Sequence, residues 1–194
     1  ALVGAPKVTA PRRRPRRQEP AQPAEQPGET VHLPTPEERA RAMEAHCLRL
    51  LLRKVDNLYL LDRALQAAGL ARFDLPDFEV SDHRAVARLL RTSLEQDELD
   101  PSDYVATNVP PELAELMDSL QAAMPFGEPA GEKLLGELVR TVLDLRLLRV
   151  SEGLRQIRLL QEDVQENNTA MDPYRDMVMQ YTQVRQLLHK ALAA

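Results

Sequence analysis

The longest proline-free stretch of the chain lies near its C-terminal end. No proline occurs between Pro129 and Pro173, and most of this stretch is dense in Leu, Glu, Arg and Gln. These residues favour helices, whereas proline ends or kinks them. Residues from about Pro129 to Asn167 therefore predict one helix of roughly forty residues, on the order of 55 to 60 Å long at the usual rise per residue. Such a helix projects beyond a compact bundle.

Two apolar faces follow one another along this helix. The first holds Leu134, Leu138, Val142 and Leu145, and the second, turned by roughly 120°, holds Val150, Leu154, Ile157 and Val164. The first half is therefore expected to pack on a bundle and the second half on a different partner. Gly153 is expected to be a soft point near the change of partner.

The partner of the second half is expected to follow directly in the sequence. Residues 167–171 form a short polar stretch, and Asp172-Pro173 is a cap followed by proline at the first helical position. An apolar stripe then recurs at helical spacing: Tyr174, Met177, Val178, Tyr181, Val184, Leu188 and Leu192. Residues 150–192 are therefore predicted to form a hairpin of two helices.

The preceding part of the chain predicts a bundle of shorter helices over residues 37–125. Thr35-Pro36 with Glu38 is a capping box that starts the first helix, Asp56 and Gly69 bound the second, and Ser81 is expected to cap the third. Phe73 and Phe78 are expected to close one end of the bundle. Residues 97–109 are interpreted as a polar connector, and a fourth helix opens at Pro110-Pro111.

Composition excludes the common sheet-based enzymes. Aromatic residues make up 4% of the chain and only seven glycines are present, too few for a β-sandwich or for the turns of a dinucleotide-binding fold. The predicted class is all-α: a helical bundle (37–125), then a long helix and a terminal helical hairpin (126–194).

Residues 1–36 differ from the rest in composition. They contain eight of the fifteen prolines and carry a net charge of +3, whereas residues 37–194 carry −8. With few large apolar side chains, the segment is expected to be a disordered Pro/Arg-rich linker that folding does not require. Its arginines are expected to make at most a weak, salt-sensitive contact with nucleic acid: Arg12, Arg13, Arg14, Arg16 and Arg17. Because the chain begins inside this biased segment, we interpret it as a piece of a longer polypeptide.

Residues that could carry chemistry are few and scattered. His46 and Cys47 are adjacent, but no second cysteine or closely spaced histidine completes a metal site. His83 lies at a predicted helix start without a nucleophile at a recognisable spacing. We therefore expect no catalytic residue, metal, cofactor or small-molecule substrate in this chain. The single cysteine and the lack of an apolar run of about 20 residues favour a cytoplasmic protein with no membrane partner.

The hairpin is the predicted binding element. Met179 points nearly opposite to the internal stripe and Met171 lies in the predicted turn, so neither is needed to hold the hairpin together; flexible exposed methionines suit partner binding. The residues expected to contact a partner are Met171, Arg175, Met179 and Gln186. Because two helices bury little surface away from the bundle, the hairpin is also expected to move relative to residues 37–125.

Two segments together resemble a known family. They are the Leu-rich run Glu44–Lys54 and, after a short helix, the segment Leu75–Leu90, which contains Asp77-Phe78, His83-Arg84 and Leu89. Over residues 38–125 this pattern resembles the bundle shared by the C-terminal region of bacterial replicative DNA primase and the N-terminal domain of the replicative helicase. Ala87 stands where these modules often carry an aromatic residue, so that position is not carried over.

The order of the parts is similar to primase, in which a flexible linker precedes the bundle and a terminal hairpin docks on the helicase. The resemblance implies a non-catalytic helicase-interaction domain that recruits primase, a DNA-directed RNA polymerase, to the replicative helicase for primer synthesis in DNA replication. The alternatives are a helicase N-terminal domain, a helical adaptor or oligomerisation module unrelated to replication, and a small metal-dependent hydrolase built around His46 and His83.

Overall fold

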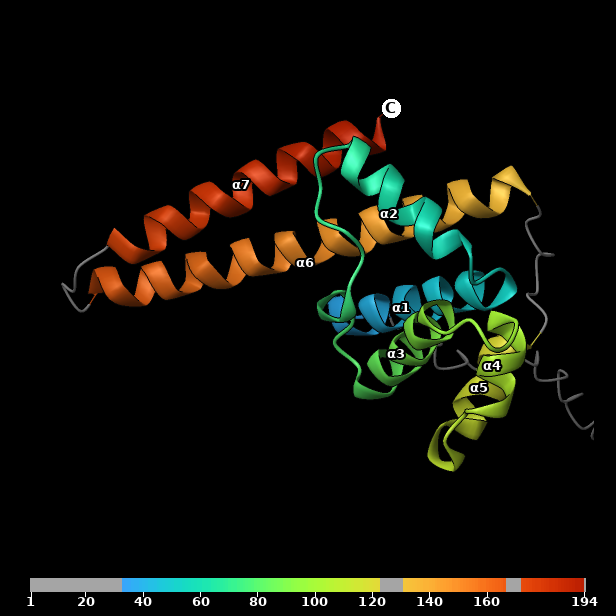
Figure 1. The fold of residues 1–194 in the computed structure, drawn as a ribbon. Coiled ribbons are helices and arrows are strands. Elements are labelled where there is room, and N and C mark those ends of the chain that lie inside the picture. Colours follow the sequence, from blue (N-terminus) through green and yellow to red (C-terminus); the bar gives the residue numbers. More distant parts are fainter. Residues whose placement is uncertain (1–32, 123–130, 167–171, 194) are drawn as a thin grey trace, which may run out of the picture. The chain divides into compact units, whose positions relative to one another are not determined.

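The structure, a computed structural model, describes residues 33–122, 131–166 and 172–193. Within these ranges the fold consists of α-helices and short 3-10 turns without a strand, so the predicted all-α class is confirmed (Figure 1). The helices are α1 (Pro36–Arg53), α2 (Asn57–Ala67), α3 (Ser81–Glu95), α4 (Pro101–Thr107), α5 (Ala114–Gln121), α6 (Glu132–Glu166) and α7 (Asp172–Leu192), with 3-10 turns at η1 (Leu75–Asp77) and η2 (Pro111–Leu113). Residues 1–32 of the predicted linker, which include its arginine cluster, and the turn that contains Met171 lie outside the described residues; residues 33–36 are described, and Thr35 and Pro36 already belong to the start of α1.

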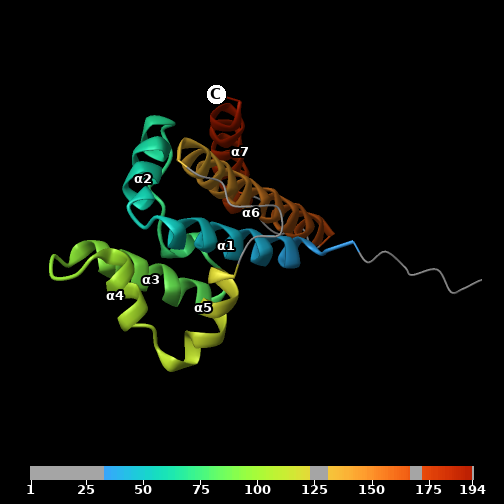
Figure 2. The same ribbon diagram turned by 90° about the vertical axis from the view of Figure 1, so that its right-hand side faces the viewer.

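Helix α1 is the centre of the bundle. It begins with the predicted capping box: Thr35 Oγ1 accepts a hydrogen bond from the Glu38 amide at 3.1 Å, and the Thr35 amide donates to Glu38 Oε2 at 2.7 Å. Its Leu-rich second half is buried, and α1 lies between α6 on one side and α3 with α5 on the other (Figure 2). The fold therefore surrounds the Leu-rich half of α1.

The end of α2 is set by a glycine. Gly69 has φ of +73°, and the amides of Gly69 and Leu70 donate to the carbonyls of Gln66 and Leu65, each at 2.9 Å. This is the Schellman arrangement, which stops a helix at a residue free to adopt a left-handed conformation. The predicted stop at Gly69 is thus confirmed.

Two local expectations are wrong. Helix α3 has Val80 at its N-cap, and Ser81 is the first helical residue. The predicted connector over 97–109 contains α4, which begins at Pro101 after Asp100 accepts a hydrogen bond from the Ser102 amide at 2.9 Å. Asp100-Pro101 is a cap-and-proline signal like the one that starts α1. The sequence did not indicate a helix here because the segment lacks an apolar stripe, and α4 buries only Val105.

Helix α6 is continuous for 35 residues, a length of about 52 Å. Leu138, Val142 and Leu145 are buried in its first half, which packs on α1, and Val150, Leu154 and Ile157 are buried in its second half. Helix α7 runs back along that second half in the opposite direction (Figure 1). The predicted change of apolar face along α6 is confirmed for these residues, whereas the side chain of Val164, also predicted on the second face, lies outside the described part of the structure.

The hairpin shares one core with the bundle. Leu188 of α7 is fully buried, and it belongs to the same apolar cluster as Leu48 of α1 and Leu138 of α6. The expectation that the hairpin buries little surface is therefore wrong at the C-terminal end of α7, because that end meets the bundle.

This shared core makes a prediction about stability. Leu188→Ala should lower the free energy of unfolding by about 2–5 kcal/mol, the usual cost of a buried leucine, and denaturant unfolding followed by circular dichroism should remain a single transition. Met179→Ala, at a side chain that is 53% exposed, is the control and should change stability little. Two transitions, with the bundle unaffected by Leu188→Ala, would contradict the shared core.

Candidate functional site

The irregular segment between α2 and α3 is held from inside by two phenylalanines. Phe73 and Phe78 are both buried, and their rings meet edge to face with centroids 5.3 Å apart. Asp62 of α2 accepts a hydrogen bond from the Phe73 amide at 2.9 Å, and Arg91 of α3 donates to the Phe73 carbonyl. The segment is thus fixed to both neighbouring helices, and the expectation that the phenylalanines close one end of the bundle fits this placement.

Helix α6 holds the same segment through Arg146. Its guanidinium binds Asp77 at two points, with Nε 2.7 Å from Oδ1 and Nη2 2.6 Å from Oδ2. It also donates to the carbonyls of Ala71 and Arg72, each at 2.8 Å. Because a planar guanidinium satisfies several acceptors in one fixed geometry, this contact sets the position of the segment against α6.

Glu44 of α1 is the acceptor that joins three elements. Its carboxylate is fully buried and receives four hydrogen bonds. Oε1 accepts from the Glu79 amide at 2.7 Å and from Arg149 Nη2 at 2.5 Å, and Oε2 accepts from the Val80 amide at 3.3 Å and from His83 Nδ1 at 2.8 Å. A carboxylate offers about four acceptor sites, so this buried charge is fully satisfied by α6, by α3 and by the two residues that precede α3.

The electrostatics follow from these bonds. Burial alone raises the pKa of the Glu44 carboxyl, but the hydrogen bonds from His83, Glu79 and Val80 and the charge of Arg149 together outweigh it. The pKa of Glu44 therefore lies below its ordinary value of 4.5, and the carboxylate is ionised at neutral pH. The ionised form is the one that the surrounding donors require.

The other candidate chemical residues have structural partners. His46 Nε2 lies 2.8 Å from Glu137 Oε1, so His46 and His83 are bound to different carboxylates. Cys47 is fully buried, and burial raises the pKa of its thiol, as do the nearby carboxylates. Among the described residues no three His, Cys, Asp or Glu side chains are placed to hold a metal ion. No observation here assembles the hydrolase site considered as an alternative.

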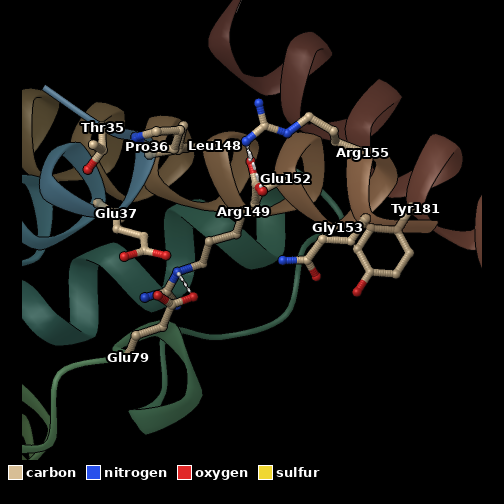
Figure 3. A pocket seen from close by; sticks show the side chains of 12 residues that line it. Thr35, Pro36, Glu37, Glu79, Leu148, Arg149, Glu152, Gly153, Arg155 and Tyr181 are labelled. Carbon is tan, nitrogen blue, oxygen red and sulfur yellow. Dashed lines mark hydrogen bonds and ion pairs between the residues drawn. The ribbon is translucent and has the colours of Figure 1, made fainter. Parts of the chain in front are cut away.

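Gly153 is a contact point between the two hairpin helices, which differs from the predicted soft point. A Cβ atom at this position would lie 2.4 Å from Cε1 of Tyr181, so only glycine admits the tyrosine ring this close to α6. Gly153 and Tyr181 face a pocket of about 480 Å³ that Thr35, Pro36 and Arg149 also line (Figure 3). Glu37, Arg149 and Glu79 extend into it from three different elements.

The residues predicted to bind a partner are exposed where the structure describes them. Arg175, Met179 and Gln186 are exposed on α7, whereas Met171 lies outside the described residues.

On the predicted internal stripe Leu188 is buried and Val178 and Tyr181 are partly buried, but Met177 and Val184 are each 41% exposed. These two positions lie at the edge of the helix contact and are not covered by α6. The expectation that they face inward is wrong.

Comparison with protein-family models, with curated proteins and with solved structures found no match to this chain. In the part of the chain that the structure describes, no helix is both long enough and apolar enough to cross a membrane.

The Glu44 network predicts a specific pH dependence. The unfolded chain takes up a proton on Glu44 near its ordinary pKa, and the folded chain does so only at lower pH, so the stability that the ionised carboxylate contributes is lost as the pH falls below 4.5 through the folded pKa. At neutral pH, Glu44→Gln should cost about 3–5 kcal/mol, because it removes one partner of a buried ion pair. Its stability should also vary less with pH below 4.5 than that of the wild type.

Denaturant unfolding between pH 3 and pH 7 measures both effects. Glu115→Gln makes the same change of charge at an exposed carboxylate of α5 and should follow the wild-type profile. If Glu44→Gln and the wild type lose stability in parallel on acidification, the assignment of that loss to Glu44 is wrong.

The Gly153 contact predicts opposite effects of one substitution at two positions in α6. Gly136→Ala, where an added Cβ meets nothing within 4 Å, should raise the free energy of unfolding by about 1 kcal/mol through helix propensity. Gly153→Ala should lower it, because the Cβ displaces the Tyr181 ring, and overpacking costs about 1–3 kcal/mol. Chemical denaturation of the two variants checks this, and an equal gain at both positions would show that Tyr181 does not depend on Gly153.

Proposed function

We propose that this chain is a non-catalytic helicase-interaction domain of a bacterial DNA primase, which recruits the primase to the replicative helicase through its terminal hairpin. The observation that carries the proposal is the exposure of several large apolar side chains on a hairpin that shares its core with a folded bundle. Large apolar side chains are exposed on both helices of the hairpin: Leu159 and Leu160 of α6, and Met177, Met179, Val184 and Leu187 of α7. Large apolar side chains that stay exposed on one structural element mark a candidate protein-binding site.

The residues that carry the family resemblance support the proposal in a second way. Glu44 and His83 form the buried network, Asp77 binds Arg146, and Phe78 lies in the core. Residues that carry the resemblance are therefore residues on which the packing of this bundle depends. They support a likeness of fold between this bundle and the primase module.

The arrangement of bundle, long helix and hairpin supports the proposal. The rigid helix α6 joins the bundle to the hairpin, so a partner bound at the hairpin is held at a fixed place relative to the bundle. Residues 1–36, if they are the flexible tether expected from their composition, let a catalytic core elsewhere in the polypeptide reach single-stranded DNA while the domain stays on the helicase. The proposed setting is the bacterial cytoplasm, and the domain itself needs no cofactor.

Binding to the purified replicative helicase of the same organism tests this proposal. The chain should bind the helicase ring in fluorescence anisotropy and co-elute with it in size-exclusion chromatography. Met179→Asp should weaken binding about tenfold, as expected when a charge is placed in a desolvated contact, without loss of helicity. Tyr181→Asp should weaken binding by opening the hairpin, because its carboxylate is forced against α6.

Leu99→Asp is the matched control for Met179→Asp. Leu99 is 48% exposed and lies between α3 and α4. The control therefore also replaces an exposed apolar side chain by aspartate, but on the bundle. Absence of binding by the wild type would contradict the proposal, as would a loss of binding with Leu99→Asp but not with Met179→Asp.

A further inference from the structure

Helix α7 carries a second apolar row beside the one that contacts α6. Met177, Val184 and Leu187 are each 40–41% exposed, and with the exposed Gln180 between them they follow the alternating spacing of three and four residues. This is the spacing at which a helix presents a continuous seam to another helix. Helix α6 covers the neighbouring row of Tyr181 and Leu188, so the second row has no helical partner within the part of α7 that the structure describes.

Val184 and Leu187 of the second row line one wall of a groove. The groove has a volume of about 760 Å³ and runs between α7, α6 and the segment from Gly69 to Asp77. Its apolar lining comes from both walls and the floor: Leu70, Phe73, Tyr181, Val184, Leu187 and Leu188. The bonds of Arg146 to the carbonyls of Ala71 and Arg72 hold the opposite wall in place, so the groove is formed before a partner arrives.

The charge at the rim is basic, although residues 37–194 carry a net charge of −8. Arg91, Arg146 and Arg149 line the groove but are engaged by carboxylates and carbonyls of the fold. Arg72 is exposed, and its guanidinium has no hydrogen-bond or ion-pair partner among the residues that the structure places. A carboxylate of a bound partner would therefore pair with Arg72 without breaking an existing hydrogen bond or ion pair of its guanidinium.

We propose that this groove takes an amphipathic helix of the docking partner, with its apolar stripe against Val184 and Leu187 and an acidic side chain paired with Arg72. The inference rests on the proposed function and specifies the chemistry of the partner's contact. A helix fits better than an extended strand, because side chains of α6, α7 and the segment from Gly69 to Asp77 line the groove, and the described residues there offer no strand edge that could pair with a backbone. The spacing of the second row fits the same occupant.

Paired substitutions test the groove separately from the outer face of α7. Leu187→Gln and Arg72→Glu should each weaken binding of the purified helicase about fivefold or more at low salt, and the effect of Arg72→Glu should shrink at high salt because ion pairs are screened. Leu60→Gln and Arg63→Glu are matched controls on α2: Leu60 has the same 40% exposure as Leu187, and neither residue lines the groove. Both controls should bind like the wild type.

Val184→Thr is a second groove variant, which keeps the test valid if Leu187→Gln misfolds. It keeps the shape of the side chain and should also weaken binding while helicity is unchanged. One outcome separates the two proposals: the wild type binds the helicase and Met179→Asp weakens binding, but the three groove variants bind like the wild type. In that case the groove is not the binding site, and the proposed function stands. Equal losses with Arg63→Glu and Arg72→Glu would likewise overturn the pairing with Arg72. Absence of helicase binding by the wild type would overturn both proposals.

Discussion

The buried carboxylate of Glu44 is the interaction on which the arrangement of this protein depends. Four donors from three parts of the chain meet on its two oxygens: the amides of Glu79 and Val80, His83 of α3 and Arg149 of α6. A buried charge of this kind is costly unless it is fully bonded, so the carboxylate tolerates only a narrow range of positions for α3 and α6 relative to α1. The apolar core around Leu48 and Leu138 then packs within that frame.

Helix α6 connects the Glu44 network to the proposed binding surface. Arg149 binds Glu44, and one turn earlier Arg146 fixes the segment that forms one wall of the groove. One turn further along, Gly153 admits the Tyr181 ring and so sets the distance between α6 and α7. Bundle and hairpin are therefore connected by one uninterrupted helix, and side chains of this helix position both walls of the groove. Val184 and Leu187 of α7 are thereby held facing the groove.

Much of this fold could be predicted from the sequence, because its signals are local. The capping box at Thr35, the stop at Gly69 and the change of apolar face along α6 each depend on residues within a few turns of one another. The Glu44 network could not be predicted, because its partners are up to 105 residues apart and follow no period. The exposure of Met177 and Val184 was also missed: helical periodicity shows how wide an apolar stripe is, but not how much of that width a neighbouring helix covers.

Hydrogen exchange measured on this chain with and without the purified replicative helicase tests the central claim most directly, because it shows where on a folded bundle and hairpin the partner lies. The account predicts slower exchange on binding in peptides from α7 and from residues 69–77, with exchange in α4 and α5 unchanged. Protection confined to α4 and α5, with α7 and residues 69–77 unaffected, would contradict it.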